Sequence, residues 1–240
     1  MTHSCSRAPL SLNLMGKLPL PGLAKTRLIP ELGAQGAAAA QARLWTHVAG
    51  VTRTWCAARP GRLYRLWCTP DTTHPLCCTL AASDQLRQQP PGDLGQRMAL
   101  IAAAAASEAS CLFLIGSDAA SLTAADLDAA EQALTTLPAV LGPTEDGGYL
   151  LLGLQRPDPS LFQNVTWGTA TVAAATRERF RALGWSWHEL PLRWDVDTPA
   201  DWQRFIDLNG VQGAGSLAGP GRSPGGVWGE APVGFGAKPQ

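Results

Sequence analysis

The chain has 240 residues, of which 45% are hydrophobic and 16% charged, and its 19 acids and 19 bases give a net charge of zero. This composition predicts a soluble globular protein with a sizeable core, and it disfavours nucleic acid or an anionic membrane surface as a partner. No apolar run is long enough to span a membrane, and no signal peptide is evident. Six cysteines without a CxxC motif are typical of a reducing cytoplasm, where we expect the protein.

The apolar pattern alternates between the period of strands and the period of helices. Strands are expected at 10–15, 63–68, 84–89 (a weak edge strand), 111–115, 139–141, 150–154 and 185–190. Helices are expected at 35–58, 74–82, 94–107, 123–137, 171–183 and 199–208, with Asp93 and Thr123 as N-caps of the third and fourth. This alternation predicts an α/β protein with a mostly parallel sheet.

Two segments refine that prediction. The run CLFLI at 111–115 is typical of a central strand covered on both faces. The turn GPTEDGGY at 142–149 joins two neighbouring strands, which suggests an antiparallel insertion. We expect one domain over 10–209, preceded by a short extension at 1–9. The last segment, 210–240, is rich in Gly and Pro without apolar periodicity, which predicts a disordered tail.

A basic loop, Gly16–Gly33, follows the first strand and precedes the first helix. Lys17, Lys25 and Arg27 lie within eleven residues without a carboxylate among them, and Pro19, Pro21 and Gly22 between them indicate a bent loop. Arginine presents a planar fork to phosphate oxygens and lysine a compact charge. The loop therefore indicates anion binding, with a solvated surface loop as the alternative. It matches neither a Walker A sequence nor a GxGxxG fingerprint.

Acidic residues follow several predicted strands, at Asp118, at Glu145 and Asp146, and at Asp195 and Asp197. Because the loops after parallel strands share one crevice, Asp118 and one of the later acids are expected to meet the basic loop there. Two carboxylates facing a cationic loop would suit Mg²⁺ with a phosphate. Structural roles remain open: Asp118 and Asp197 each as a helix cap, and Asp146 with its following glycine as an ordinary turn.

Six motifs then occur in order: KLPLPGLAKTRLIPELG, PGDLGQRM, LIGSDAASLT, LGPTEDGGYLLLGL, WGTATVAAAT and DVDTPADW. Together, over about residues 10–206, they resemble a bacterial family of GT-A-like glycosyltransferases, described as nucleotide-diphospho-sugar transferases and sometimes linked with arsenosugar biosynthesis. They are more distantly similar to phospholactate and molybdopterin guanylyltransferases. One departure is Ala119-Ala120, where the family usually has a Cys-Pro or similar pair, and 72–89 matches poorly.

The resemblance implies a GT-A-like three-layer α/β/α sandwich and assigns roles within it. A divalent metal, Mg²⁺ or Mn²⁺, would be held by Asp118 and Asp197, and Asp118 and Asp146 would be catalytic. Asp146 would bind a hydroxyl or act as a base. Donor phosphates would be bound by Lys17, Lys25, Thr26, Arg27 and Arg97, and the substrate pocket would be shaped by Glu145, Gly147, Gly148, Tyr149 and Trp167. Alternatively, Arg97 has a structural role at the start of its helix and Trp167 belongs to the core.

Three functions remain open at this stage. The resemblance favours glycosyl transfer from a nucleotide sugar to a small-molecule acceptor. The cationic loop and the lack of a DxD motif, with only Ser117-Asp118-Ala119 present, favour nucleotidyl transfer from a triphosphate with release of pyrophosphate. A catalytically silent nucleotide-binding regulator is the third.

Overall fold

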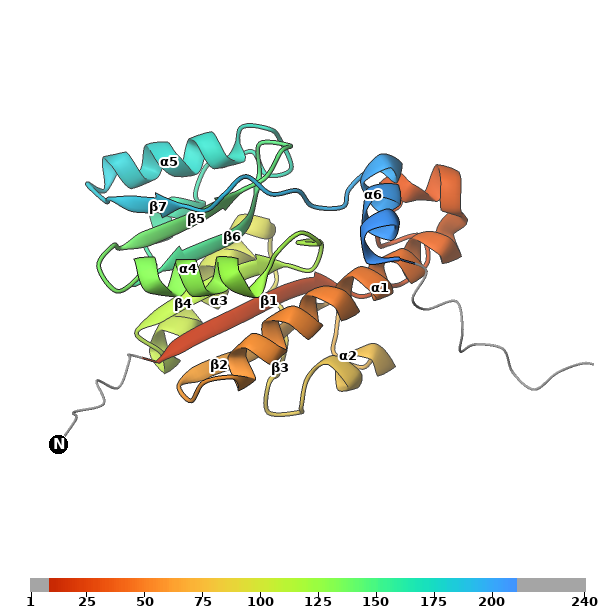
Figure 1. Ribbon diagram of the computed structural model, residues 1–240, viewed down its shortest axis with the longest axis horizontal. Helices are drawn as coiled ribbons and strands as arrows, with labels where there is room; N and C mark the ends of the chain where they lie inside the picture. The colour runs from red at the N-terminus through yellow and green to blue at the C-terminus, as the bar shows by residue number, and fades with distance from the viewer. Residues whose placement is uncertain (1–8, 211–240) are drawn as a thin grey trace, which may run out of the picture.

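The computed structural model describes residues 9–210, which form a seven-stranded sheet with helices on both faces (Figure 1). The strand order is β3-β2-β1-β4-β6-β5-β7, and every neighbouring pair is parallel except the two that β6 makes with β4 and β5. The strands are β1 (Leu10–Lys17), β2 (Arg62–Thr69), β3 (Leu86–Gln88), β4 (Cys111–Gly116), β5 (Ala139–Pro143), β6 (Tyr149–Leu154) and β7 (Trp187–Glu189). The predicted α/β fold with a mostly parallel sheet is confirmed.

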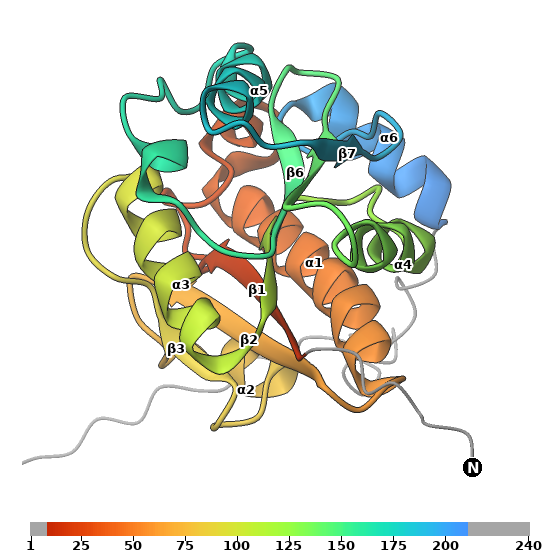
Figure 2. The same ribbon diagram turned by 90° about the vertical axis from the view of Figure 1, so that its left-hand side faces the viewer.

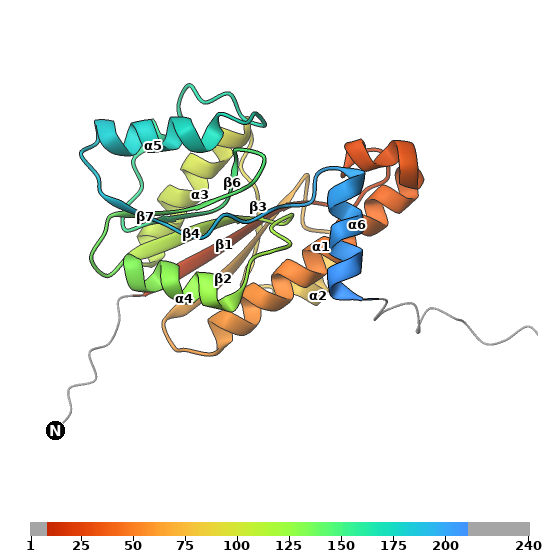
Figure 3. The same cartoon turned by 45° about the horizontal axis from the view of Figure 1, so that its top comes forward.

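Helices form the outer two layers (Figures 2 and 3). One face of the sheet is covered by α1 (Ile29–Ala57), α2 (Pro75–Leu80) and α4 (Ala124–Ala133), and the other by α3 (Leu94–Glu108) and α5 (Val172–Ala182). Two short 3-10 helices, η1 (Thr26–Leu28) and η2 (Pro159–Phe162), lie in loops. Helix α6 (Pro199–Asn209) packs against the first half of α1, beyond the end of the sheet.

Strand β4 shows why its sequence is continuously apolar. Leu112 and Leu114 pack in the cluster formed with α3 and α5, whereas Phe113 and Ile115 pack in the cluster formed with α1 and α4. Since alternate side chains point to opposite faces, a strand with a helical layer on each side needs apolar residues at every position. The prediction of a central, doubly covered strand is confirmed.

Helix starts also agree with the sequence. The side chains of Asp93 and Thr123 each accept a hydrogen bond from the backbone N–H three residues on, in capping boxes completed by Gln96 and Asp126. Helix α4 ends earlier than predicted, at Ala133, and continues as turns.

The first helix starts earlier than predicted but breaks once. Helix α1 has a non-helical residue at Gly33 (φ 67°, ψ 170°), the residue where the predicted basic loop ended. A positive φ is accessible to glycine without steric cost, so Gly33 separates the first helical turn, which belongs to the loop, from the long helix that follows.

The antiparallel departure predicted around 142–149 is confirmed, because this turn leads β5 into β6, which runs against both of its neighbours. The predicted extension and tail lie outside the described residues except for Pro9 and Gly210, so the domain boundaries stay predictions. Over 9–210, no helix has both the length and the apolar character needed to cross a membrane.

Candidate active site

A cleft of about 600 Å³ opens where β1, β2 and β4 end, at the carboxyl edge of the parallel strands. In open α/β sheets this edge is where ligands bind. Of the predicted site residues, the cleft is lined by Lys17, Lys25, Thr26, Arg27, Arg97, Asp118, Asp146, Gly148, Tyr149, Trp167 and Asp197. Glu145 and Gly147 do not line it, and Asp195, which was not assigned a role, does.

Lys25 is the most enclosed cation of the basic loop. Its backbone is left-handed (φ 47°, ψ 48°), an uncommon conformation for a residue with a side chain. Its side chain is only 7% exposed, and Nζ donates to Asp118 Oδ2 at 3.4 Å and to the carbonyl oxygen of Val196. Arg27, in contrast, is 65% exposed and forms an ion pair with Asp197. The basic loop is thus joined to two acidic loops.

Neither Asp118 nor Asp197 acts as a helix cap. Thr123 caps α4, and Thr198 caps α6 in a box with Asp201. The Asp118 carboxylate instead lies over Gly116, where an added Cβ would stand 2.5 Å from Oδ1. The structural alternatives for these two acids therefore do not apply.

The backbones of the two acidic loops are bonded to each other. The backbone N–H of Val196 donates to the carbonyl oxygen of Asp118 at 3.2 Å, and the Val196 side chain is fully buried. This contact fixes the DVDT segment beside the end of β4, with Asp195 and Asp197 on either side of the buried valine.

Asp195 is the acid that the sequence interpretation did not select. The pKa of its carboxyl group is raised to about 7, first by burial and then by the negative charges of Asp118 and Asp146, and Lys25 partly offsets this. The carboxylates of Asp118, Asp146 and Asp195 therefore interact at one end of the cleft. The Asp-Val-Asp pattern could have indicated Asp195 as well as Asp197, because alternate residues of an extended segment point the same way.

Asp146 is both a turn residue and a cleft residue. Its Oδ1 accepts from Thr144 Oγ1 and from the backbone N–H of Gly148 at 2.9 Å, as in an ordinary Asp-Gly turn. The neighbouring Glu145 turns away and forms an ion pair with Arg204 at 2.8 Å. Gly147 (φ 85°) approaches the chain itself, since an added Cβ would lie 2.2 Å from the carbonyl oxygen of Ala170.

An aromatic wall closes the side of the cleft near the start of α3. The rings of Tyr149 and Trp167 meet edge to face with centroids 6.5 Å apart, and the Trp167 indole lies against Gly95, where an added Cβ would stand 2.5 Å from Nε1. Arg97 follows on the same helix, and its Nε is buried without a hydrogen-bond partner among residues 9–210. A buried donor without a partner lowers the stability of the fold by about 1–3 kcal/mol, and an anionic ligand that accepts a hydrogen bond from Arg97 Nε would remove this cost.

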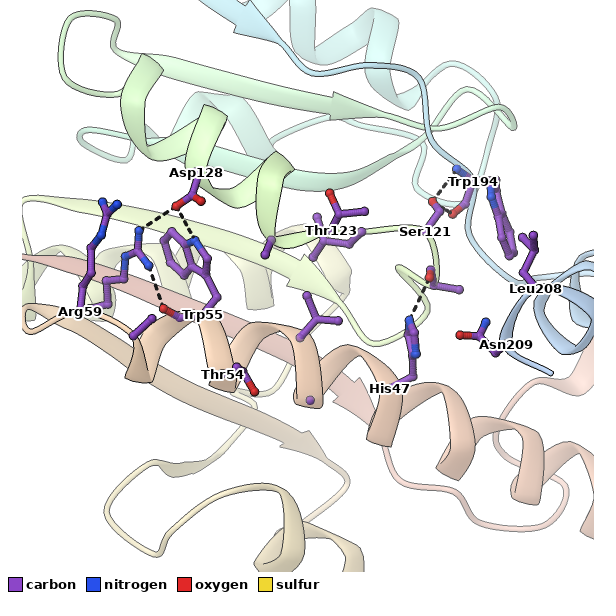
Figure 4. Close-up of a pocket in the computed structure, with 17 residues that line it drawn as sticks. His47, Thr54, Trp55, Arg59, Ser121, Thr123, Asp128, Trp194, Leu208 and Asn209 are labelled. Carbon is purple, nitrogen blue, oxygen red and sulfur yellow. Dashed lines mark hydrogen bonds and ion pairs between the residues drawn. The ribbon is translucent and has the colours of Figure 1, made fainter. Parts of the chain in front are cut away.

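A second, larger cavity of about 880 Å³ lies between α1, α4 and the end of α6 (Figure 4). It contains none of the predicted site residues. Its polar groups are largely paired within the chain: His47 Nε2 lies 3.1 Å from the carbonyl oxygen of Ala120, and Asp128 accepts from Trp55 Nε1 and Arg62. Charge and unsatisfied donors both favour the cleft at the strand ends as the functional site.

A family model matches part of this chain. Residues 52–169 match the DUF2064 family model. That family is described as an uncharacterized protein conserved in bacteria, and the DUF2064 match includes Arg97, Asp118, Asp146 and Trp167 but not the basic loop. A search of curated proteins found no significant match.

Solved structures extend the likeness beyond the DUF2064 segment. A Desulfovibrio desulfuricans protein, provisionally described as a nucleotide-diphospho-sugar transferase, is 27% identical, with a TM-score of 0.70 over 79% of this chain and 82% of that one. CMP:2-keto-3-deoxy-manno-octonic acid synthetase, in complex with CTP, is 11% identical, with a TM-score of 0.52 over 84% and 98%.

A Mycobacterium tuberculosis protein in complex with manganese is 14% identical, with a TM-score of 0.50 over 83% and 98%. The fold is that of nucleotide-diphospho-sugar transferases and nucleotidyltransferases, which confirms the resemblance read from the six motifs.

Proposed function

We propose that this protein is a divalent-metal-dependent transferase that takes a nucleotide sugar as donor and transfers the glycosyl group to a small-molecule acceptor. The observation that carries the proposal is one cleft, at the carboxyl ends of the strands, lined by four cations and four carboxylates. The cations are Lys17, Lys25, Arg27 and Arg97, and the acids are Asp118, Asp146, Asp195 and Asp197. Such a site fits a diphosphate and a divalent cation together.

The cations would bind the donor phosphates. Lys17 and Arg97 carry no ion pair within residues 9–210, and Arg97 also presents its unpartnered Nε. Charge on the leaving nucleoside diphosphate would be stabilised by such preorganised donors, which cost no reorganisation when the bond breaks. Thr26 stands between the two cations of the loop, where its hydroxyl would add a neutral donor.

The acids would hold the metal. Among residues 9–210, no three Asp, Glu, His or Cys side chains are arranged as a ready-made metal centre. Yet burial, and then the negative charges of Asp118 and Asp146, raise the pKa of Asp195 to about 7, and this grouping of acids fits a divalent cation. Mg²⁺ typically takes one or two protein carboxylates and completes its shell with water and phosphate. A bound cation would neutralise charge on the donor diphosphate.

We assign the protein ligands to Asp118 and one acid of the DVDT segment. Asp118 and Val196 are joined by a backbone hydrogen bond, so Asp195 and Asp197 both lie within a short span of Asp118. Asp197 is the acid that the family resemblance favours, and Asp195 is the acid whose pKa is raised in part by the charge of Asp118.

Asp146 would contact the acceptor. Its Oδ1 is occupied by the turn, while Oδ2 has no hydrogen-bond partner within the described part of the chain. That oxygen would bind an acceptor hydroxyl or remove its proton. Tyr149 and Trp167 would form the wall against which the base or sugar packs.

Nucleotidyl transfer is the second candidate, and one observation favours it. A DxD motif that began at Asp118 would place its second acid at position 120, where this chain has Ala120, a buried residue without a metal-binding side chain. A single acid at that point, facing several cations, suits a triphosphate with release of pyrophosphate.

A thermal-shift screen tests the proposal. Nucleotide sugars, nucleoside diphosphates and nucleoside triphosphates are compared with and without Mn²⁺, and the products formed with candidate acceptors are identified by mass spectrometry. A ligand at 100 times its dissociation constant stabilises the fold by about 2.7 kcal/mol. We expect the greatest shift with a nucleotide sugar and Mn²⁺. A greater shift with a triphosphate, followed by pyrophosphate release, would favour the second candidate, and no shift with any nucleotide would reject both.

A further inference from the structure

Two of the four cleft cations are already bonded to cleft acids. Lys25 Nζ bonds Asp118 and the carbonyl oxygen of Val196, and Arg27 pairs with Asp197. Lys17 and Arg97 make no such pair within the described residues, and on the acidic side neither does Asp146. The cleft therefore contains paired and unpaired members of both charges.

These pairs involve the same atoms that the proposed function needs. Arg27 cannot present its full fork to a phosphate while it holds Asp197, and Asp118 Oδ2 cannot coordinate a cation while it accepts from Lys25. A ligand that binds one of these paired residues must therefore displace its partner and leave that partner available.

We propose that a divalent cation and a polyphosphate enter this cleft by exchange of counter-ions, so that each ligand releases the residues that bind the other. The cation takes Asp118 and Asp197 and releases Lys25 and Arg27, which then bind phosphate. The exchange rests on the proposed function, because it assigns to that site the coupling between its two ligands. The exchange predicts that removing a paired acid strengthens binding of the polyphosphate, and that removing a paired cation strengthens binding of the metal.

The geometry limits the exchange to side chains. Val196 is fully buried and its N–H is bonded to the carbonyl oxygen of Asp118, so the backbone between the two acids is anchored. Arg27 and Asp197 are 65% and 44% exposed, so their side chains have room to separate without moving the core. Lys25 is enclosed, and its release involves only the shift of Nζ from one anion to another.

The Arg27–Asp197 pair supplies the cleanest test, because both side chains are exposed and neither substitution threatens the fold. Exposed ion pairs contribute about 0.2–1 kcal/mol, which corresponds to about 1.4- to 5-fold in affinity. Asp146→Asn and Lys17→Ala are the matched controls, since each removes one cleft charge that is not engaged in an ion pair within residues 9–210. At 0.15 M salt, with a Debye length of about 8 Å, they report the effect of charge alone.

Inorganic pyrophosphate is titrated calorimetrically in EDTA, so that no metal–pyrophosphate complex forms. Asp197→Asn is expected to bind it about 1.4- to 5-fold more tightly than wild type, and more tightly than Asp146→Asn does. Manganese alone is titrated by electron paramagnetic resonance. Arg27→Ala is expected to bind Mn²⁺ about 1.4- to 5-fold more tightly than wild type, beyond any gain in Lys17→Ala, while it binds pyrophosphate more weakly.

The outcomes separate this inference from the proposed function. If wild type binds both probes but Asp197→Asn and Arg27→Ala do no more than their controls, the exchange is overturned and the metal and phosphate sites stand. If wild type binds neither probe, the proposed function falls and the exchange falls with it. Circular dichroism spectra of all four variants should match that of wild type, which would show that the substitutions leave the fold intact.

Discussion

Asp195 offers a direct test of the electrostatics of the cleft. Burial, and then the negative charges of Asp118 and Asp146, raise the pKa of its carboxyl group from its ordinary value near 3.8 to about 7. The folded protein therefore keeps a proton that the unfolded chain has already lost between about pH 4 and pH 7. Since stability falls with rising pH wherever the folded state binds more protons, this group destabilises the fold increasingly through that window and fully above pH 7.

The magnitude follows from the size of the shift. A pKa shift of about 3 units corresponds to about 4 kcal/mol, and partial access to solvent reduces this to about 1–3 kcal/mol. In a chain of this length, each kcal/mol moves the melting temperature by about 2–4 °C. Asp195→Asn should therefore melt about 2–12 °C above wild type at pH 8 and close to wild type at pH 4.

Melting is followed by circular dichroism from pH 4 to pH 8 in EDTA, with Asp84→Asn, at an exposed turn, as the control. Addition of Mn²⁺ to wild type at pH 8 should recover part of the difference, because a cation neutralises the cluster. If the melting curves of wild type and Asp195→Asn run parallel over the whole range, the carboxylates do not interact as described.

Two further comparisons concern the frame of the cleft. Gly16→Ala should destabilise the fold by about 1–3 kcal/mol in urea unfolding, because its Cβ would stand 2.2 Å from the buried indole of Trp45. Gly50→Ala, at an open position within a helix, should stabilise the fold by about 0.5–1 kcal/mol. Equal effects of the two substitutions would contradict this packing. Lys25→Ala should cost about 1–3 kcal/mol of stability, because it removes an enclosed side chain together with its bonds to Asp118 and to the carbonyl oxygen of Val196. Arg27→Ala should cost less than about 1 kcal/mol, because its ion pair is exposed. The reverse order would refute the assignment of Lys25 as the buried cation.

Elements governed by local chemistry were predictable from the sequence. Asp93 and Thr123 were recognisable as caps because a capping box needs only residues three apart. The central position of β4 followed from its unbroken apolar run, since no exposed strand would carry one. The position of β6 between β4 and β5 was only suggested, because strand order depends on contacts between distant segments.

The site was predictable only as a set of loops. Parallel strands bring their carboxyl ends together, so the meeting of the basic loop with Asp118 and the DVDT segment followed from topology. Which partners meet did not follow, because it depends on side-chain directions. Glu145 turns to Arg204, and Asp195 faces the other acids. The close approach of Gly147 to Ala170 likewise joins segments that are distant in the sequence.

The proposed function requires a nucleotide donor to bind in the cleft at the ends of β1, β2 and β4. A crystal structure of the protein with Mn²⁺ and the nucleotide that gives the greatest thermal shift tests it most directly. We expect phosphate oxygens within hydrogen-bond distance of Arg97 and at least one of Lys17, Lys25 and Arg27, with Mn²⁺ on Asp118. A nucleotide bound instead in the cavity between α1 and α4, or phosphates remote from all four cations, would contradict the proposal.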